Sequence, residues 1–119
     1  MRQRDEKHLA FIRTLPCLIC RDNTSTEAAH VRMSDARIAK PITGNSIKPD
    51  DKYVLPLCGD CHRGPQGQHS MGERRFWQER GIDAVLICLA LDSVSGDAEE
   101  AERIIDAVQC PAIASALRA

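Results

Sequence analysis

The chain has 119 residues, of which 28% are charged, and its formal net charge at pH 7 is −1. This length fits one domain, so we expect a single domain over residues 1–119. No apolar run approaches the roughly 20 residues that a membrane span needs, and the charged first residues do not resemble a secretion signal. We therefore expect a cytoplasmic protein that does not bind a membrane.

The charge is unevenly distributed along the chain. Residues 1–80 carry a net charge of +4, and residues 81–119 carry a net charge of −5. A mildly basic body followed by an acidic tail suits a nucleic-acid-binding protein, but ordinary solvated surface explains the same charges equally well. Charge alone therefore does not identify a partner.

In chain order, the first predicted element is a short helix over residues 5–15, with Leu9 and Ile12 on one side. Pro16 ends this helix and leads into the first of two identical turns, Cys17-Leu-Ile-Cys20. The second turn is Cys58-Gly-Asp-Cys61, separated from the first by 37 residues. Two CxxC turns together supply the four thiolates of a tetrahedral zinc site, and nothing indicates the oxidising compartment that disulfides require.

Between the two turns we expect a strand over residues 26–33, a long functional loop over residues 34–52, and a second strand over residues 53–57. A helix should start near Cys61, although Gly64-Pro65-Gln66-Gly67 interrupts it. Residues 71–80 look helical, with Phe76 and Trp77 as the apolar contact and Gly81 as the cap.

Residues 81–119 are predicted to form a helical extension, with an apolar helix over residues 82–92, a second helix from Gly96-Asp97 and a break at Pro111. The other two cysteines, Cys88 and Cys110, are expected to be core residues. Apolar stripes suggest that these helices pack on the body of the protein or on a second copy of the chain. The stripe residues are Val85, Leu86 and Leu89, and Ile104, Ile105 and Val108.

Three of the four histidines lie close to the cysteine turns in sequence. His30 lies between the turns, His62 follows Cys61 directly, and His69 comes seven residues later. Imidazole can bind a divalent cation, and it can also accept a proton near neutral pH. Hydrolysis of a phosphodiester needs both a base for water and a cation for the developing charge.

Together, these residues resemble an HNH (His-Me finger) endonuclease, over roughly residues 15–80. The matching segments are Ala28-Ala29-His30, residues 48–51 (Lys-Pro-Asp-Asp), residues 54–62 (Val-Leu-Pro-Leu-Cys-Gly-Asp-Cys-His), residues 69–73 (His-Ser-Met-Gly-Glu), and Phe76-Trp77. The greatest similarity is to the zinc-containing branch related to the phage recombination enhancement function (Ref).

The resemblance implies an α+β fold with a ββα-metal core over residues 16–80, an N-terminal helix in residues 1–15 and the C-terminal helices. In this family four cysteines, here Cys17, Cys20, Cys58 and Cys61, hold a structural Zn²⁺. His30 matches the general base, and His62 and His69 match ligands of a catalytic Mg²⁺ or Mn²⁺. In a crystal, Zn²⁺ can occupy the site of this catalytic ion. The implied activity is hydrolysis of phosphodiester bonds in DNA. The resemblance also implies a phage or prophage origin, a link to DNA recombination or repair, and a recombination protein as a further partner.

Two positions depart from the family pattern. Ala29 stands where many members have a metal-ligating residue before the base, and Tyr53 lies near the position of the middle Asn. His69 is the expected replacement for the ligand, and Asp50 or Asp51 for the orienting group.

Basic side chains in and beside the long loop are candidates for contact with backbone phosphates. They are Arg32, Lys48, Lys52 and Arg63. The alternative is that they are simply solvated. Few aromatic residues are available to stack on bases, so we expect little sequence specificity.

Two other function classes compete with the nuclease. One is a non-catalytic zinc-binding module that recognises nucleic acid or a protein, which Ala29 and Tyr53 favour. The other is a redox or zinc-storage protein, which leaves the histidines unexplained.

Overall fold

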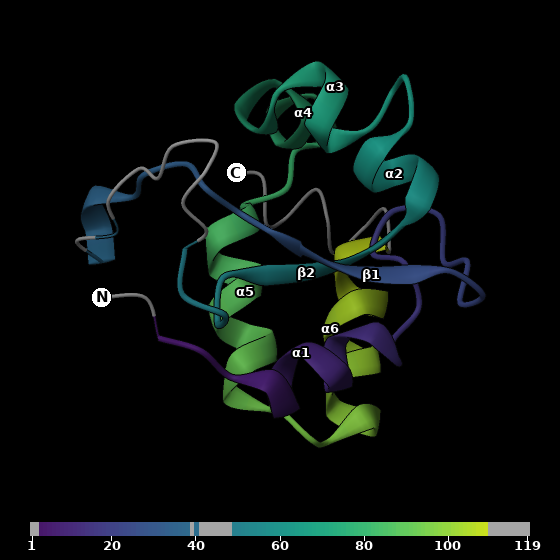
Figure 1. Ribbon diagram of the computed structural model, residues 1–119, viewed down its shortest axis with the longest axis vertical. Helices are drawn as coiled ribbons and strands as arrows, with labels where there is room; N and C mark the ends of the chain where they lie inside the picture. Colours follow the sequence, from purple (N-terminus) through teal and green to yellow (C-terminus); the bar gives the residue numbers. More distant parts are fainter. Residues whose placement is uncertain (1–2, 39, 41–48, 110–119) are drawn as a thin grey trace.

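Two antiparallel strands lie between two groups of helices in the computed structural model, which describes residues 3–38, 40 and 49–109 (Figure 1). The elements in chain order are α1 (Glu6–Arg13), β1 (Thr26–His30), the 3-10 turn η1 (Ala36–Ile38), β2 (Val54–Cys58), α2 (Gly59–Arg63), α3 (Gln68–Met71), α4 (Glu73–Arg80), α5 (Ala84–Ser93) and α6 (Ala98–Gln109). In Figure 1, α3 and α4 lie above the strands, and α1 and α6 lie below them. The α+β class predicted from the sequence is confirmed.

The sheet has a simple register in which Thr26 faces Cys58 and His30 faces Val54. All five residues of β2 are buried, because helices cover the sheet from both sides. The strand predicted over residues 26–33 is too long. One further bond joins the Val31 N–H to the Tyr53 carbonyl, but the N–H groups of Arg32 and Met33 then donate to the Glu73 carboxylate. A side chain from α4 therefore takes the place of a strand partner.

α1 begins where the sequence predicts a helix, and its N-cap is Asp5. The Asp5 side chain accepts a hydrogen bond from the His8 N–H at 3.0 Å, which satisfies one of the unpaired donors of the first turn. Leu9 and Ile12 are buried, as predicted, and His8 is buried with them. This helix therefore packs under the sheet through one apolar side.

The helix predicted over residues 71–80 begins two residues later, at Glu73, because the backbone turns at Gly72 and Met71 ends the separate short helix α3. The φ of Gly72 is +89°, a conformation that side-chain-bearing residues rarely adopt. α3 ends there and α4 begins, and Gly81, with a φ of +65°, caps α4 as predicted. The glycine between the two helices was visible in the sequence, but its role as a break was not predicted.

α5 and α6 pack on the body of the protein, but through a partly different stripe from the one predicted. α5 begins at Ala84, and its buried positions are Ala84, Ile87, Cys88 and Leu91, together with Val85. Leu86, which was assigned to the buried stripe, is 51% exposed. Ile105 and Val108 of α6 are buried, and Phe76 and Trp77 of α4 lie in the same core.

Several predictions fall on residues outside the described ranges. They are Lys48 as a phosphate contact, Cys110 as a core residue, and Pro111 as a break in the last helix. Within the described ranges, none of the helices has the length and apolar character that crossing a membrane requires.

Candidate functional site

The four cysteines of the two CxxC turns come together between α1, the start of β1 and α2. The first turn is closed by hydrogen bonds from the Arg21 N–H to the Cys17 carbonyl and from the Cys17 N–H to the Asp22 carbonyl. The second turn begins at Cys58, the last residue of β2 and the N-cap of α2. A bond from the Leu18 N–H to the Pro56 carbonyl, 2.8 Å long, fastens the first turn to β2 beside the second.

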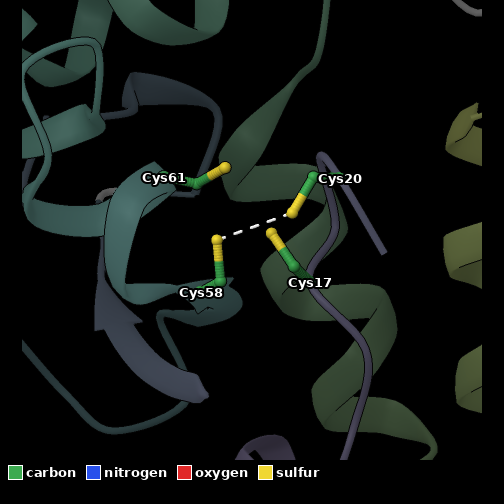
Figure 2. Close-up of side chains that lie close together, drawn as sticks. All are labelled: Cys17, Cys20, Cys58 and Cys61. Carbon is green, nitrogen blue, oxygen red and sulfur yellow. Dashed lines mark hydrogen bonds between the residues drawn. The ribbon is translucent and has the colours of Figure 1, made fainter. Parts of the chain in front are cut away.

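The four sulfur atoms point toward one another (Figure 2), and all of them lie within 4.8 Å of each other. Tetrahedral zinc with bonds of about 2.3 Å places its sulfur ligands about 3.8 Å apart. The Cys20 and Cys58 sulfurs are 3.5 Å apart, and these cysteines are free thiols rather than disulfides. The cluster therefore has the size and the donor set to hold a metal such as zinc.

The surroundings of the cluster shift the pKa values of two of its thiols, those of Cys17 and Cys61, in opposite directions. Burial works to raise the pKa of the Cys17 thiol, but backbone N–H groups, those of Cys20 and Cys58 foremost, lower it below its usual range. Burial raises the pKa of the Cys61 thiol. A bound cation offsets such a burial cost, because thiolate is the form that ligates metal.

His30, the predicted base, lies at the end of β1 and is hydrogen-bonded to a buried carboxylate. Its Nε2 is 3.0 Å from Oδ1 of Asp51, whose side chain is fully buried. With Asp51 ionised, this contact favours the tautomer of the neutral ring that has the proton on Nε2 and the lone pair on Nδ1. Of the two orienting residues suggested by the sequence, Asp51 holds His30, whereas Asp50 accepts from the Gln3 N–H.

His62, in α2, is held in the same way by a carboxylate from β1. Its Nδ1 is 2.7 Å from Oε1 of Glu27, and the Arg63 guanidinium donates to both oxygens of that carboxylate. Hydrogen bonds from Arg63, and to a lesser degree from His62, lower the pKa of Glu27 to about 2 against the opposing effect of burial. Glu27 was not singled out from the sequence, because its pairing with His62 depends on the register of β1 against α2.

His69, in α3, lies beside His62. The two ring centroids are 6.2 Å apart, with the planes edge to face. The turn that joins α2 to α3 brings the two rings together, and the backbone of this turn is tightly packed. A Cβ on Gly67 would lie 2.6 Å from the Asp60 carbonyl oxygen, so only glycine fits.

Gln68, the neighbour of His69, joins α3 to the core and to the end of β1. It accepts a hydrogen bond from Trp77 Nε1 at 2.8 Å and donates from Nε2 to the His30 carbonyl at 3.4 Å. Gln68 was not predicted as a site residue, since a lone glutamine beside an apolar helix carries no distinctive pattern. Gln68 links the helix that carries His69 to the strand that carries His30.

The histidine pairs differ from the cysteine cluster in that they do not converge on one point. Among residues 3–38, 40 and 49–109, the cysteine cluster is the one group of three or more potential ligand side chains close enough to share an ion. The structure thus brings His62 and His69 together as neighbours, and His30 together with Asp51. A complete protein ligand set around His62 is not formed by the described side chains.

The two departures from the family pattern are both buried. Ala29 is fully buried in the core, and Tyr53 is 8% exposed. Two lysines contact the Tyr53 ring, with Lys40 Nζ at 4.9 Å and Lys52 Nζ at 5.2 Å from its centroid. Tyr53 therefore packs the base of the long loop.

The predicted phosphate contacts lie in different environments. Lys52 is exposed, Arg63 is exposed but bound to Glu27, and Arg32 is half-buried. Two other basic residues of the loop are engaged within the protein: Lys40 donates to the Met33 carbonyl at 2.7 Å, and Arg37 is held by Asp35 and Asp83. Lys52 thus contacts the Tyr53 ring, whereas Arg63 is held by a carboxylate.

A comparison of the chain with protein-family models, curated proteins and solved structures finds no match.

Proposed function

We propose that the protein is a metal-dependent endonuclease of the HNH type that hydrolyses phosphodiester bonds in DNA. The hydrogen bond between His30 and the buried Asp51 carries this proposal. It gives the imidazole a fixed tautomer and a stabilised protonated state, which are the properties that a general base for water needs.

In the proposed reaction, Nδ1 of His30 takes a proton from a water molecule as the water oxygen attacks the phosphorus. The bond from phosphorus to the 3′-oxygen breaks, and that oxygen leaves with the electron pair and later gains a proton from solvent. Asp51 remains ionised and stabilises the imidazolium that forms, without itself taking the proton. The positions of His30 and Asp51 are set by β1 and by the segment that leads into β2.

A divalent cation, when bound, supplies charge to stabilise the phosphorane-like state and the leaving oxygen. His62 and His69 would hold it. The Glu27 carboxylate on Nδ1 of His62 supports this assignment, since metal-ligating histidines commonly donate their other ring N–H to a carboxylate. Phosphate oxygens and water would supply the remaining ligands, as is usual for Mg²⁺.

The four cysteines would hold a structural zinc that fixes the first turn against the start of α2. His62 follows Cys61 directly, so a metal on the cysteines also fixes the start of the helix that carries His62. Catalytic groups need support of this kind, because small displacements lower the rate steeply.

A second candidate is a zinc-stabilised module that binds nucleic acid without cutting it. The buried Ala29, and the lack of a three-ligand group around His62 among the described residues, favour it.

Nicking of supercoiled plasmid by the zinc-loaded protein separates the two candidates. With Mg²⁺ or Mn²⁺ we expect nicking, and His30→Ala should lower the rate about 10²–10⁴-fold, the usual contribution of a general base. The variant is purified in parallel, and its zinc content and thermal unfolding are measured as controls. Equal nicking by both proteins would indicate a contaminating nuclease, and DNA binding without nicking would favour the second candidate.

A further inference from the structure

The chain's first described residues contact the segment that carries Asp51. The Asp51 N–H donates to the Gln3 carbonyl at 2.9 Å, and the Gln3 N–H donates to Oδ1 of Asp50 at 2.7 Å. The Asp5 N–H donates to Oδ2 of Asp51 at 2.7 Å. Three hydrogen bonds therefore join residues 3–5, here called the N-terminal strap, to residues 50–51.

The third of these bonds is made by the N–H of Asp5, the N-cap residue of α1. In many helices this N–H finds its acceptor within the helix itself. In a capping box, a Glu or Gln at the third helical position accepts from the N–H of the N-cap residue. The third position of α1 is His8, which instead points into the protein and pairs its Nδ1 with the Ser95 hydroxyl at 2.7 Å. The N–H of the N-cap residue Asp5 is left for an acceptor from another part of the chain, and Asp51 supplies it.

Asp51 thus links the strap to His30. Its Oδ2 accepts from the Asp5 N–H, its Oδ1 contacts Nε2 of His30, and its side chain is fully buried. A buried carboxylate whose two oxygens both make hydrogen bonds has little freedom to rotate. It therefore also limits the rotation of the His30 ring that it contacts. The anchor is firm, because α1 itself is packed under the sheet through Leu9 and Ile12.

We propose that the N-terminal strap is a positioning element of the active site, which fixes the tautomer and orientation of His30 through Asp51. This inference rests on the proposed function for its catalytic consequence, although the positioning itself can be measured without any reaction. The strap belongs to no sequence motif, and its two shortest bonds span 46 and 47 residues of chain.

The test uses the zinc-loaded protein and two truncations of the full chain. Removal of residues 1–5 deletes all three strap bonds, and removal of residues 1–3 deletes the two made by Gln3 but keeps Asp5 and α1. Lys7→Gly is the matched control, because it costs α1 about 1 kcal/mol, similar to the loss of a cap, but keeps the strap. Lys7 is exposed and lies on α1.

The first readout is the pair of ring-nitrogen NMR shifts of His30, assigned by comparison with His30→Ala. In the full chain and in Lys7→Gly we expect two well-separated shifts, with the proton on Nε2. Without residues 1–5 the shifts should approach each other, as two tautomers mix, and without residues 1–3 they should move part of the way. Unchanged shifts in both truncations, or an equal change in Lys7→Gly, would overturn the proposal.

The second readout is plasmid nicking. We expect the loss of residues 1–5 to lower kcat about tenfold or more with little change in KM, because it weakens the base rather than DNA binding. If the longer truncation does not fold, the shorter one decides the question by the same two readouts. If the full chain does not nick plasmid but the His30 shifts respond as expected, the proposed function fails and the positioning role stands.

Discussion

The cysteine cluster and the histidine region, which contains His30 and His62, are adjacent in sequence at Cys61 and His62. The side chains of the two regions are nevertheless held in place in different ways. The four sulfurs approach one another within 4.8 Å and come from two tight turns. In the histidine region, His30 and His62 are each held by a carboxylate from a distant segment, Asp51 and Glu27 respectively.

This difference matches the two kinds of metal site that proteins use. A structural zinc site is closed by four protein ligands, whereas a catalytic site keeps positions open for water and substrate. Carboxylates behind histidines orient the rings and leave the other nitrogen for chemistry or for a metal. Under the proposed function, the cysteines serve stability and the histidines serve the reaction, and each of these roles can be tested separately.

The largest expected effect is loss of the fold when the cysteine cluster is broken. Cys58→Ser removes a buried ligand, and a structural zinc supplies on the order of 10 kcal/mol, comparable to the whole stability of a small domain. We expect little bound zinc and no cooperative thermal transition.

The matched control for this change is Cys88→Ala, which alters a buried cysteine of α5 that is not part of the cluster. It should keep one zinc per chain and lose only about 1–2 kcal/mol. Full zinc content and cooperative unfolding in Cys58→Ser would contradict the closed-site assignment.

The next effect in size concerns the base. Asp51→Asn replaces an acceptor by a group that can donate to His30, which favours the wrong tautomer. We expect nicking to fall about 100-fold or more with zinc content unchanged. Asp97→Asn, an equal change at the start of α6 that can still accept from the Glu100 N–H, should nick like the natural chain. If Asp51→Asn nicks at the natural rate, Asp51 does not orient the base.

A smaller effect is expected for Glu27, which orients His62. Glu27→Gln should weaken Mn²⁺ binding about 10–100-fold, as is common for partners behind a ligand. Because the pKa of Glu27 is lowered to about 2 from a usual 4.5, its carboxylate is fully charged above pH 4.5 and loses charge only as the pH falls toward 2. Glu27 itself therefore keeps its charge throughout the range from about pH 6 to 8, in which the titrations are made.

Glu79→Gln is the control for Glu27→Gln, because Glu79 pairs with Arg75 on the exposed side of α4. Calorimetric titration of Mn²⁺ gives both affinities. Equal Mn²⁺ affinity in Glu27→Gln and Glu79→Gln would show that Glu27 does not act on a metal site.

The smallest effect is expected for phosphate contacts. Lys52→Ala should lower the slope of log K against log salt for duplex DNA by about 0.9, the loss of one phosphate contact. Arg37→Ala should leave that slope unchanged, because Asp35 and Asp83 already hold the Arg37 guanidinium. Fluorescence anisotropy at several salt concentrations measures the slope, and equal slopes for the two variants would remove Lys52 from the DNA-binding surface.

Features of the site that depend on short spacing could be predicted from the sequence. The cysteine turns, the helix after Asp5 and the cap at Gly81 each depend on residues within a few positions of one another. Local geometry fixes such features whatever the rest of the chain does. The histidines were identified in the same way, from their closeness to the cysteine turns.

The partners of the histidines could not be predicted with the same certainty, because they depend on contacts between distant segments. Asp51 was one of two alternatives for the orienting group, and Glu27 and Gln68 were missed. The strand after His30 was extended too far because the competing acceptor, Glu73, lies 41 residues away from Arg32. Periodicity reports which residues face a core, but it does not report which distant side chain takes a hydrogen bond.

The central claim is that His62 belongs to an open metal site separate from the cysteine cluster. Titration of the zinc-loaded protein with Mn²⁺, followed by calorimetry and by the loss of the free Mn²⁺ electron paramagnetic resonance signal, tests it most directly. We expect one Mn²⁺ bound per chain in addition to one zinc, and loss of that Mn²⁺ in His62→Ala with the zinc retained. Failure of the natural chain to bind Mn²⁺, or equal binding by His62→Ala, would contradict it.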